Sequence, residues 1–373
     1  MLSPVQLTQD LVRFETINPP GNERACAHHV GRLLEQAGYT VEYHEFAEAR
    51  TSLIARLAGR GGRPSLCFTG HLDTVPLGAA PWTRDPLAGE IADGKLWGRG
   101  SSDMKAGVAA FVIATLAVAA RGCLERGLVL VITAGEETGC VGAADLAARG
   151  DALGEAGAVV VAEPTSNYPC IGHKGALRLE AVTRGVTAHG SMPEHGENAI
   201  YTMARAVHAL EAFEFAVEPH PVLGRPTLNV GTIQGGLNVN SVPDACTIGI
   251  DIRTIPGQEE GPTIAALAAA VGPEVELEPT RWVTGVWTEP SHPWIQHVYD
   301  VTARVTGARA APRTLPYFTD GSILAHAYGG VPTVILGPGE AELAHQTNEY
   351  CVVERIEQAA EIFERIADQW CRG

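Results

Sequence analysis

Short apolar runs separated by helical segments are the feature that most constrains the fold of this chain. The runs comprise residues 65–69, 128–133, 158–161 and 332–336. Strands buried on both faces are continuously apolar, and their alternation with helices is typical of a mostly parallel sheet that helices cover. Residues 105–121 and 352–369 have the periodicity of such helices. The sequence therefore predicts an α/β fold with a mixed, mostly parallel sheet.

A different pattern occupies the middle of the chain. Residues 177–183 alternate apolar and polar side chains, as a half-exposed strand does. The following segments read as helix, strand, strand, helix and strand, at residues 198–213, 227–233, 246–252, 262–271 and 275–277. This β-α-β-β-α-β order is a ferredoxin-like arrangement. We therefore expect an inserted domain at 174–284, with residues 1–173 and 285–373 forming one discontinuous domain.

Charge and composition limit the partners of the chain. Its 43 acidic and 27 basic residues give a net charge of −16, which disfavours nucleic acid and anionic membranes as partners. The most apolar run, residues 107–120, is shorter than the about 20 residues that a membrane span needs, so a buried helix is expected. The eight cysteines form no CxxC pair, and residues 1–10 lack a secretory pattern. We expect free thiols and a cytoplasmic protein.

Histidine and carboxylate side chains follow several of the predicted strands. Ligands bind at the carboxyl edge of an open α/β sheet, where these side chains would lie. His71 and Asp73 point to the same side of an extended chain, so Asp73 can orient the imidazole while its other nitrogen binds a metal. Glu136 and Glu137 are adjacent and point in different directions. One can therefore bind a metal while the other stays free as a base.

Three further segments have ordinary structural explanations when each is considered alone. Asp103, at the entry to a long helix, is a normal helix N-cap, and His345 is a surface histidine. Glu163 follows the strand at 158–161. Considered together, histidines and carboxylates from separate strands converge on one sheet edge. This donor set suits Zn²⁺, with Co²⁺ or Mn²⁺ as tolerated substitutes, and a carboxylate-bridged metal pair can activate water.

In their order along the chain, these segments resemble the signatures of the acetylornithine deacetylase / succinyl-diaminopimelate desuccinylase family of dinuclear zinc amidohydrolases. Aminoacylase and glutamate carboxypeptidase are relatives of that family. The resemblance covers nearly the whole chain and implies two Zn²⁺ ions. It implies that His71 and Glu163 bind one ion, that Glu137 and His345 bind the other, and that Asp103 bridges them.

The resemblance also implies roles for residues that do not bind metal. Glu136 would be the general base, and Asp73 would orient a metal-binding histidine. The inserted domain would be a lid and dimerisation domain, so a homodimer is expected. Its His189 would complete the partner subunit's active site by stabilising the oxyanion. The residues implied to contact the substrate or line its pocket are Asn240, Arg253, Gly337 and Gly339.

The predicted activity is hydrolysis of the amide bond of a small N-acyl amino acid by a metal-activated water. A carboxypeptidase or dipeptidase acting on a dipeptide-like substrate is an open alternative, because the sequence does not show which side of the amide the lid contacts. A non-catalytic binding protein is a third alternative. The presence of all five candidate metal ligands and of the base Glu136 argues against it. Residues 317–322 depart from the Gly-Thr-Ser-Asp-Ala-Arg pattern of the desuccinylase, which disfavours succinyl-diaminopimelate as substrate. Ser101 and Ser102 replace the more usual Ala or Thr pair.

Overall fold

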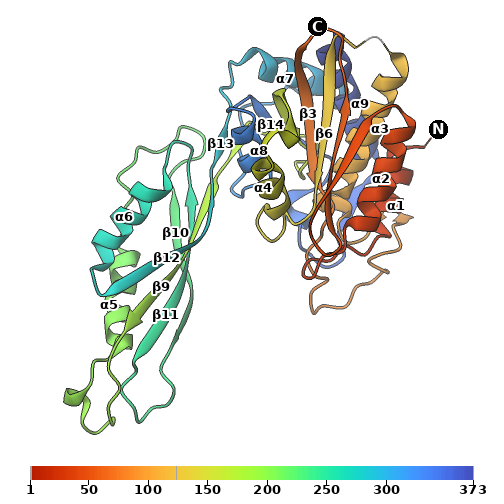
Figure 1. Ribbon diagram of the computed structural model, residues 1–373. Helices are drawn as coiled ribbons and strands as arrows, with labels where there is room; N and C mark the ends of the chain where they lie inside the picture. Colours follow the sequence, from red (N-terminus) through yellow and green to blue (C-terminus); the bar gives the residue numbers. More distant parts are fainter. Residues whose placement is uncertain (1, 123, 373) are drawn as a thin grey trace. The chain divides into compact units, whose positions relative to one another are not determined.

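A computed structural model describes residues 2–122 and 124–372, which divide into two compact units (Figure 1). Unit 2 consists of His173–Gly285 and Thr314–Phe318, and unit 1 contains the rest of the described chain. The expected inserted domain, residues 174–284, lies within unit 2. The short segment Thr314–Phe318 joins that unit from a region expected in the discontinuous domain.

Unit 1 is built on a six-stranded sheet. In spatial order its strands are β1 (Thr40–Ala47), β2 (Arg50–Leu57), β6 (Arg126–Thr133), β3 (Arg63–His71), β7 (Ala156–Val161) and β14 (Thr333–Ile335). The last four run parallel, whereas β1 and β2 form an antiparallel hairpin at one edge. The predicted mixed, mostly parallel sheet is confirmed. The hairpin was not predicted, because β1 carries alternate exposed polar side chains rather than an apolar run.

Helices pack on both faces of this sheet (Figure 1). On one face, Phe68 of β3 packs against Phe111 of α3 and Phe363 of α9, with ring centroids 5.8 and 5.6 Å apart. Helices α4 and α8 contact each other on the opposite face. The helices of unit 1 are α1 (Pro4–Val12), α2 (Arg24–Gln36), α3 (Ala106–Arg121), α4 (Val141–Ala148), α7 (Pro293–Thr306), α8 (Gly321–Ala327) and α9 (Val353–Arg372).

One described helical segment, Ser101–Arg121, is long and apolar enough to cross a membrane, but 67% of its apolar 18-residue window is buried inside the structure. Its apolar side chains pack in the core of unit 1, as predicted for a buried helix. Seven cysteines of the described chain are buried free thiols. Cys123, also expected to be a free thiol, lies outside the described residues.

Unit 2 is a four-stranded antiparallel sheet with two helices that pack against it. The chain order is β9 (Gly175–Arg184), α5 (Ala199–Glu211), β10 (Thr227–Gly235), β11 (Ala245–Thr254), α6 (Glu260–Val271) and β12 (Val275–Val283). Alternate residues of β11, including Ile248 and Ile250, are buried in the core of the unit. The predicted β-α-β-β-α-β arrangement is confirmed.

Two small sheets complete the fold of the described chain. In unit 1, β4 (Glu90–Ala92) and β15 (Tyr350–Val352) flank β5 (Lys95–Trp97). In the other small sheet, β8 (Gly172–His173) pairs with β13 (Val286–Trp287).

Candidate metal centre

The carboxyl ends of the neighbouring parallel strands β3 and β7 bring the first group of predicted ligands together. His71 is the last residue of β3, and Glu163 lies two residues beyond β7. His71 Nε2 lies 3.3 Å from Asp103 Oδ1 and 3.9 Å from Glu163 Oε1. One donor atom from each of these residues lies within 4.8 Å of the other two. The three side chains thus form one candidate cation site.

A second group shares Asp103 with the first. His345 Nε2 lies 3.4 Å from Asp103 Oδ2 and 3.0 Å from Glu137 Oε2. These three residues again offer donor atoms within 4.8 Å of one another. Asp103 therefore directs one carboxylate oxygen to each group, which is the arrangement that a bridging ligand requires.

The local backbone explains why Asp103 is free to do this. It lies in a turn, Ser101–Lys105, that precedes α3, and its own backbone there is not helical (φ −120°, ψ 93°). Lys105 is the N-cap of α3, and no side chain caps that helix by a hydrogen bond. The ordinary interpretation of Asp103 as a helix N-cap is therefore wrong, since its carboxylate contacts two histidines instead.

The chemistry of the cluster fits divalent cations. Burial and the Asp103 charge raise the pKa of Glu163 well above its usual range, and they also raise that of Glu137. Hydrogen bonds to Asp103 and Glu137 raise the pKa of His345 to about 10. Glu137 Oε1 is buried and has no hydrogen-bond partner among the described residues. Crowded buried carboxylates need compensating positive charge, and imidazole with carboxylate suits zinc.

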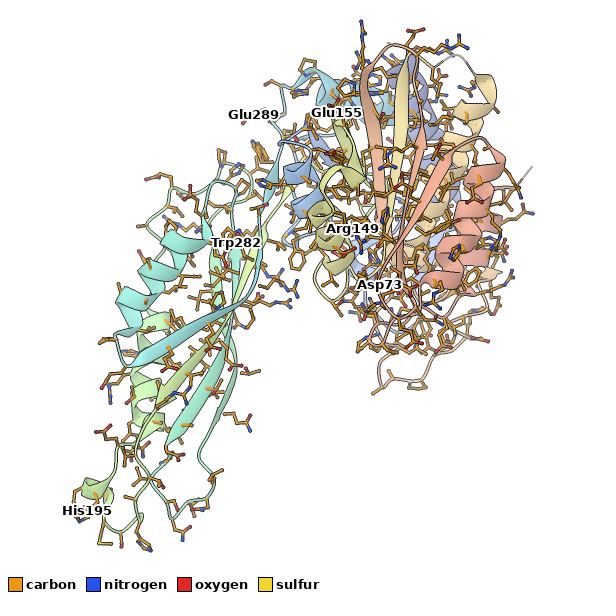
Figure 2. All side chains as sticks on the ribbon, viewed as in Figure 1. Asp73, Arg149, Glu155, His195, Trp282 and Glu289 are labelled. Carbon is orange, nitrogen blue, oxygen red and sulfur yellow. The ribbon has the colours of Figure 1, made fainter. Side chains whose placement is uncertain are left out.

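Asp73 connects the first group to the loop that bears the two glutamates. It lies just beyond β3 (Figure 2), and its Oδ1 is 3.5 Å from His71 Nδ1. Its carboxylate accepts hydrogen bonds from the backbone N–H groups of Glu136 and Glu137, both at 3.1 Å, and from the Asn18 side-chain amide at 2.9 Å. Asp73 can therefore orient the imidazole and hold the loop together. Asn18 was not among the predicted site residues.

Glu136 belongs to neither ligand group. Burial raises its pKa well above the usual range, an effect that the His71 charge opposes and the Asp320 charge reinforces. Cys140 Sγ lies 3.6 Å from Glu136 Oε1, and the Thr133 hydroxyl donates to Asp320 Oδ2 at 2.5 Å. A buried carboxyl with a raised pKa that stays outside the ligand groups is suited to proton transfer.

Asp320 is a site residue that sequence reasoning missed. Burial raises its pKa to about 6, and it forms a buried cluster with Glu136 and Cys140. Residues 317–322 drew attention only because they depart from the desuccinylase pattern. That departure was the one signal in the sequence, and it did not show where the carboxylate lies.

Two predicted pocket residues, Gly337 and Gly339, lie in unit 1 against the ligand-bearing loops. A Cβ at Gly337 would lie 2.3 Å from the Ala162 carbonyl oxygen, and one at Gly339 would lie 2.0 Å from that of Ser102. Both contacts are far too short for a side chain. Glycine at these positions therefore allows the backbone to approach the segments that carry Glu163 and Asp103.

The remaining predicted residues lie in unit 2. His189 and Asn240 are exposed on loops that the Gly190 N–H joins by donating to the Asn240 carbonyl at 2.7 Å. His189 Nδ1 is 2.8 Å from the Ser191 hydroxyl. Arg253 on β11 donates to Asp251 Oδ2 at 2.8 Å. The structure thus brings the five predicted ligands together in unit 1 and places these three residues in the other unit.

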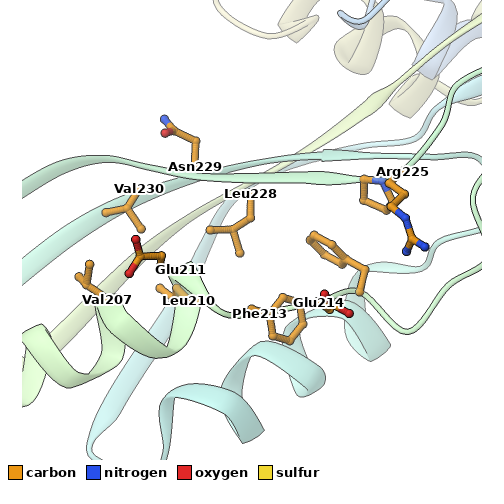
Figure 3. Close-up of a pocket in the computed structure, with 11 residues that line it drawn as sticks. Val207, Leu210, Glu211, Phe213, Glu214, Arg225, Leu228, Asn229 and Val230 are labelled. Carbon is orange, nitrogen blue, oxygen red and sulfur yellow. The ribbon is translucent and has the colours of Figure 1, made fainter.

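A hollow of about 690 Å³ lies in unit 2 beside the end of α5 and strand β10 (Figure 3). Its lining includes apolar side chains such as Leu210, Phe213 and Leu228, together with Glu211 and Arg225. None of the predicted catalytic, substrate-binding or metal-binding residues is among its described lining residues. The hollow therefore shares no described lining residue with the candidate metal centre.

The α/β scaffold with histidines and carboxylates at the carboxyl edge of its parallel strands is typical of a metal-dependent hydrolase. Residues 67–369 match Peptidase family M20/M25/M40, and the chain belongs to this family. The acetylornithine deacetylases of Myxococcus xanthus and Proteus mirabilis (strain HI4320) are each 32% identical to it. Each alignment covers 91% of this chain, and it covers 90% and 88% of the two relatives respectively. The predicted family is confirmed.

Solved structures share the complete fold. A metallo-carboxypeptidase of the M20 family from Sulfolobus solfataricus has a TM-score of 0.82 at 16% identity, with 100% of both chains covered. The aminopeptidase PepT from Bacillus cereus has a TM-score of 0.78 at 22% identity, with 98% of this chain and 97% of that chain covered. A dinuclear metal binding peptidase from Bacillus subtilis has a TM-score of 0.73 at 15% identity, with 99% and 98% covered. The predicted α/β fold is thereby confirmed.

Proposed function

We propose that the protein removes the acyl group from a small N-acyl amino acid by hydrolysis of its amide bond. The observation that carries this proposal is the pair of ligand groups joined at Asp103, with the buried Glu136 beside them and outside both. Deacetylase relatives that align over most of the chain support an acyl substrate.

Two divalent cations, zinc with cobalt or manganese as substitutes, would be held by His71, Asp103, Glu137, Glu163 and His345. When bound, they would supply the positive charge that acidifies water and polarises the amide carbonyl. Glu136 accepts a proton from the attacking water, whose oxygen bonds to the carbonyl carbon. Glu136 then delivers that proton to the leaving nitrogen as the C–N bond breaks, which yields a carboxylic acid and an amine.

Unit 2 contributes three residues to this proposal, supported by membership of the family. His189 of a partner subunit stabilises the oxyanion, and Asn240 contacts the substrate. Arg253 has a planar fork of donors that matches a carboxylate, so it binds the carboxylate of the amino acid. In unit 1, Gly337 and Gly339 line the pocket.

A peptidase acting on dipeptide-like substrates is the second candidate. What favours it is the likeness to structures named as a carboxypeptidase and an aminopeptidase, which cover nearly the whole chain. Both candidates use the same metal centre and the same base. They differ in the group attached to the amide carbonyl, so substrate preference separates them.

Activity on matched substrates tests the proposal. With Zn²⁺ or Co²⁺ added, we expect kcat/KM for N-acetyl amino acids to exceed that for dipeptides by at least about tenfold. Methyl esters of the same N-acetyl amino acids are expected to be poorer substrates, because they lack the carboxylate proposed to bind Arg253. Released amine is the quantity to measure, with metal-free protein as the control. A tenfold preference for dipeptides would favour the peptidase, and no turnover of either class by metal-loaded protein would contradict both.

We also propose a cytoplasmic enzyme that acts on small molecules, without a nucleic-acid or membrane partner. The net charge of −16 disfavours polyanionic partners. The seven buried free cysteines of the described chain fit a reducing compartment.

A homodimer formed through unit 2 is the proposed assembly. Strand β10 is an edge strand of the unit 2 sheet, and its Ile233 is 61% exposed. Leu237 and Val239, just beyond that strand, are almost fully exposed. An exposed edge with apolar side chains favours pairing with another strand, and a twofold axis would pair it with its own copy.

The assembly is tested by Ile233→Lys, which places a charge on the proposed interface. We expect the parent protein to have the mass of a dimer in light scattering and the variant to dissociate at micromolar concentration. Ile91→Lys is the matched control, because Ile91 is 45% exposed on β4 of unit 1 and should leave the mass unchanged. A monomeric parent protein that is fully active would rule out the proposed dimer.

A further inference from the structure

We infer that Glu349 and Arg99 are positioning residues that hold the Asp103 turn and the His345 segment in place for metal binding. The two residues lie beside the candidate metal centre and belong to neither ligand group. The inference rests on the proposed function, because it presupposes that the centre binds cations.

The Glu349 carboxylate holds the turn that bears the bridging ligand. Its Oε1 accepts hydrogen bonds from the backbone N–H groups of Ser102 at 2.7 Å and Asp103 at 3.0 Å. Its Oε2 accepts hydrogen bonds from the Gly100 N–H at 3.0 Å and from Arg99 Nη1 at 2.7 Å. The side chain is fully buried, and each oxygen accepts two hydrogen bonds. This carboxylate therefore has no free capacity to act as a metal ligand or as a base.

The Glu349 contacts join two segments that are far apart in the sequence. Glu349 lies four residues after His345, whereas 246 positions separate Glu349 from Asp103 in the sequence. The carboxylate thus fastens the segment that carries one ligand to the backbone of another ligand. A shift of either segment would change the distance between His345 Nε2 and Asp103 Oδ2, which is 3.4 Å.

The Arg99 guanidinium extends the same connection to two more backbone segments. Its Nη1 donates to the Gln346 carbonyl at 3.2 Å, and its Nη2 donates to the carbonyls of Pro76 at 3.0 Å and His345 at 3.5 Å. Pro76 follows His71 and Asp73 by a few residues. The planar fork of arginine makes these bonds together with the ion pair to Glu349, and lysine lacks that geometry.

The His345 ligand has particular need of this support. Its side chain is 54% exposed, and its backbone has a φ of +64°, a conformation that L-residues adopt at a cost. Packing therefore restrains this imidazole less than it restrains the fully buried His71. The hydrogen bonds that Arg99 donates to the carbonyls of residues 345 and 346 restrain the backbone instead.

A contribution to folding stability does not by itself explain the buried Glu349–Arg99 ion pair. A buried ion pair loses solvation, and replacement by apolar residues is often neutral or stabilising. Partners that orient metal ligands, in contrast, typically change metal affinity by 10–100-fold. The position of the pair, bonded to the backbone of two ligands, favours a role in metal affinity.

The test is a Zn²⁺ titration of Glu349→Gln against a chromophoric chelator. Glutamine keeps the shape of the side chain, but its NH₂ group cannot accept the hydrogen bonds that N–H groups donate to one of the carboxylate oxygens. We expect about 10–100-fold weaker Zn²⁺ binding, with the ion of the His345 group lost first and occupancy restored by excess Zn²⁺. Thermal unfolding of the metal-free proteins measures the purely structural cost.

Glu23→Gln is the matched control. Glu23 is fully buried and pairs with Arg50 at 2.9 Å, and no described hydrogen bond of its side chain reaches a predicted metal ligand. This variant should lose stability like Glu349→Gln and keep the Zn²⁺ affinity of the parent protein. Arg99→Lys is the second test variant, expected to weaken Zn²⁺ binding about tenfold, and it decides the matter if Glu349→Gln does not fold.

The outcomes separate this inference from the proposed function. If the parent protein binds no Zn²⁺, the proposed metal centre fails and the inference fails with it. If the parent protein binds Zn²⁺ and a folded Glu349→Gln or Arg99→Lys binds it equally tightly, only the inference is overturned. Weakening by Glu23→Gln to the same extent would also overturn it, because any buried ion pair would then have the effect.

Discussion

Glu136→Gln is expected to lower kcat by about 10²–10⁴ and to leave the bound cations in place. Glutamine keeps the size of the side chain but cannot accept a proton from water. Glu136 lies outside the two groups joined at Asp103, and its own cluster with Cys140 and Asp320 contains no histidine. Its loss should therefore not remove a ligand of the proposed metal pair. The measurement pairs kcat with elemental analysis of the purified variant.

Glu137→Gln is the matched comparison, because it makes the same chemical change one residue away. Glu137 Oε2 lies 3.0 Å from His345 Nε2, and its other oxygen is buried without a described hydrogen-bond partner. We expect this variant to lose metal affinity first, with activity partly restored by excess Zn²⁺. If Glu136→Gln loses metal while Glu137→Gln retains it, the two roles are reversed.

Asp103→Ala is expected to weaken both cation sites, and by more than the 10–100-fold that outer partners of metal ligands typically contribute. The reason is geometric: Oδ1 of Asp103 faces the group of His71, and Oδ2 faces the group of His345. Removing this carboxylate also leaves both histidines without their shared anionic partner. Zn²⁺ titration and elemental analysis measure the loss, and hydrolysis should fall with occupancy.

His345→Ala provides the control for the shared ligand. His345 belongs to the second group only, so this variant should retain one tightly bound cation per chain. The contrast between one retained ion and none distinguishes a terminal ligand from a bridging ligand. Two tightly bound ions in Asp103→Ala would show that Asp103 does not bridge, whatever the activity of that variant.

The predictable parts of the fold were those in which burial leaves a pattern in the sequence. Strands β6 and β7 are almost entirely buried and therefore contain continuous apolar runs. Strand β1 lies at the sheet edge with exposed side chains, so its polar residues resemble a loop. Charged edge strands hold their place through backbone pairing with a neighbour, which a local pattern does not record.

The candidate ligands were foreseeable because topology constrains them. His71 ends one strand and Glu163 follows its parallel neighbour, so the order of the sheet brings them together. Asp103 shows where this reasoning stops. Its position before a helix suited an N-cap equally well, and only the kinked turn before α3 directs its carboxylate to two histidines.

The sequence by itself determined the α/β class, the β-α-β-β-α-β insertion and the residue types that gather at the sheet edge. Apolar periodicity and the ends of parallel strands are local properties, which explains why they could be read from the chain. Only the tertiary structure decided that Asp320 lies beside Glu136 and that Glu349 holds the Asp103 turn. Those contacts join residues separated by some 180 to 250 positions. They depend on how loops pack after the sheet has formed, and no local pattern encodes that packing.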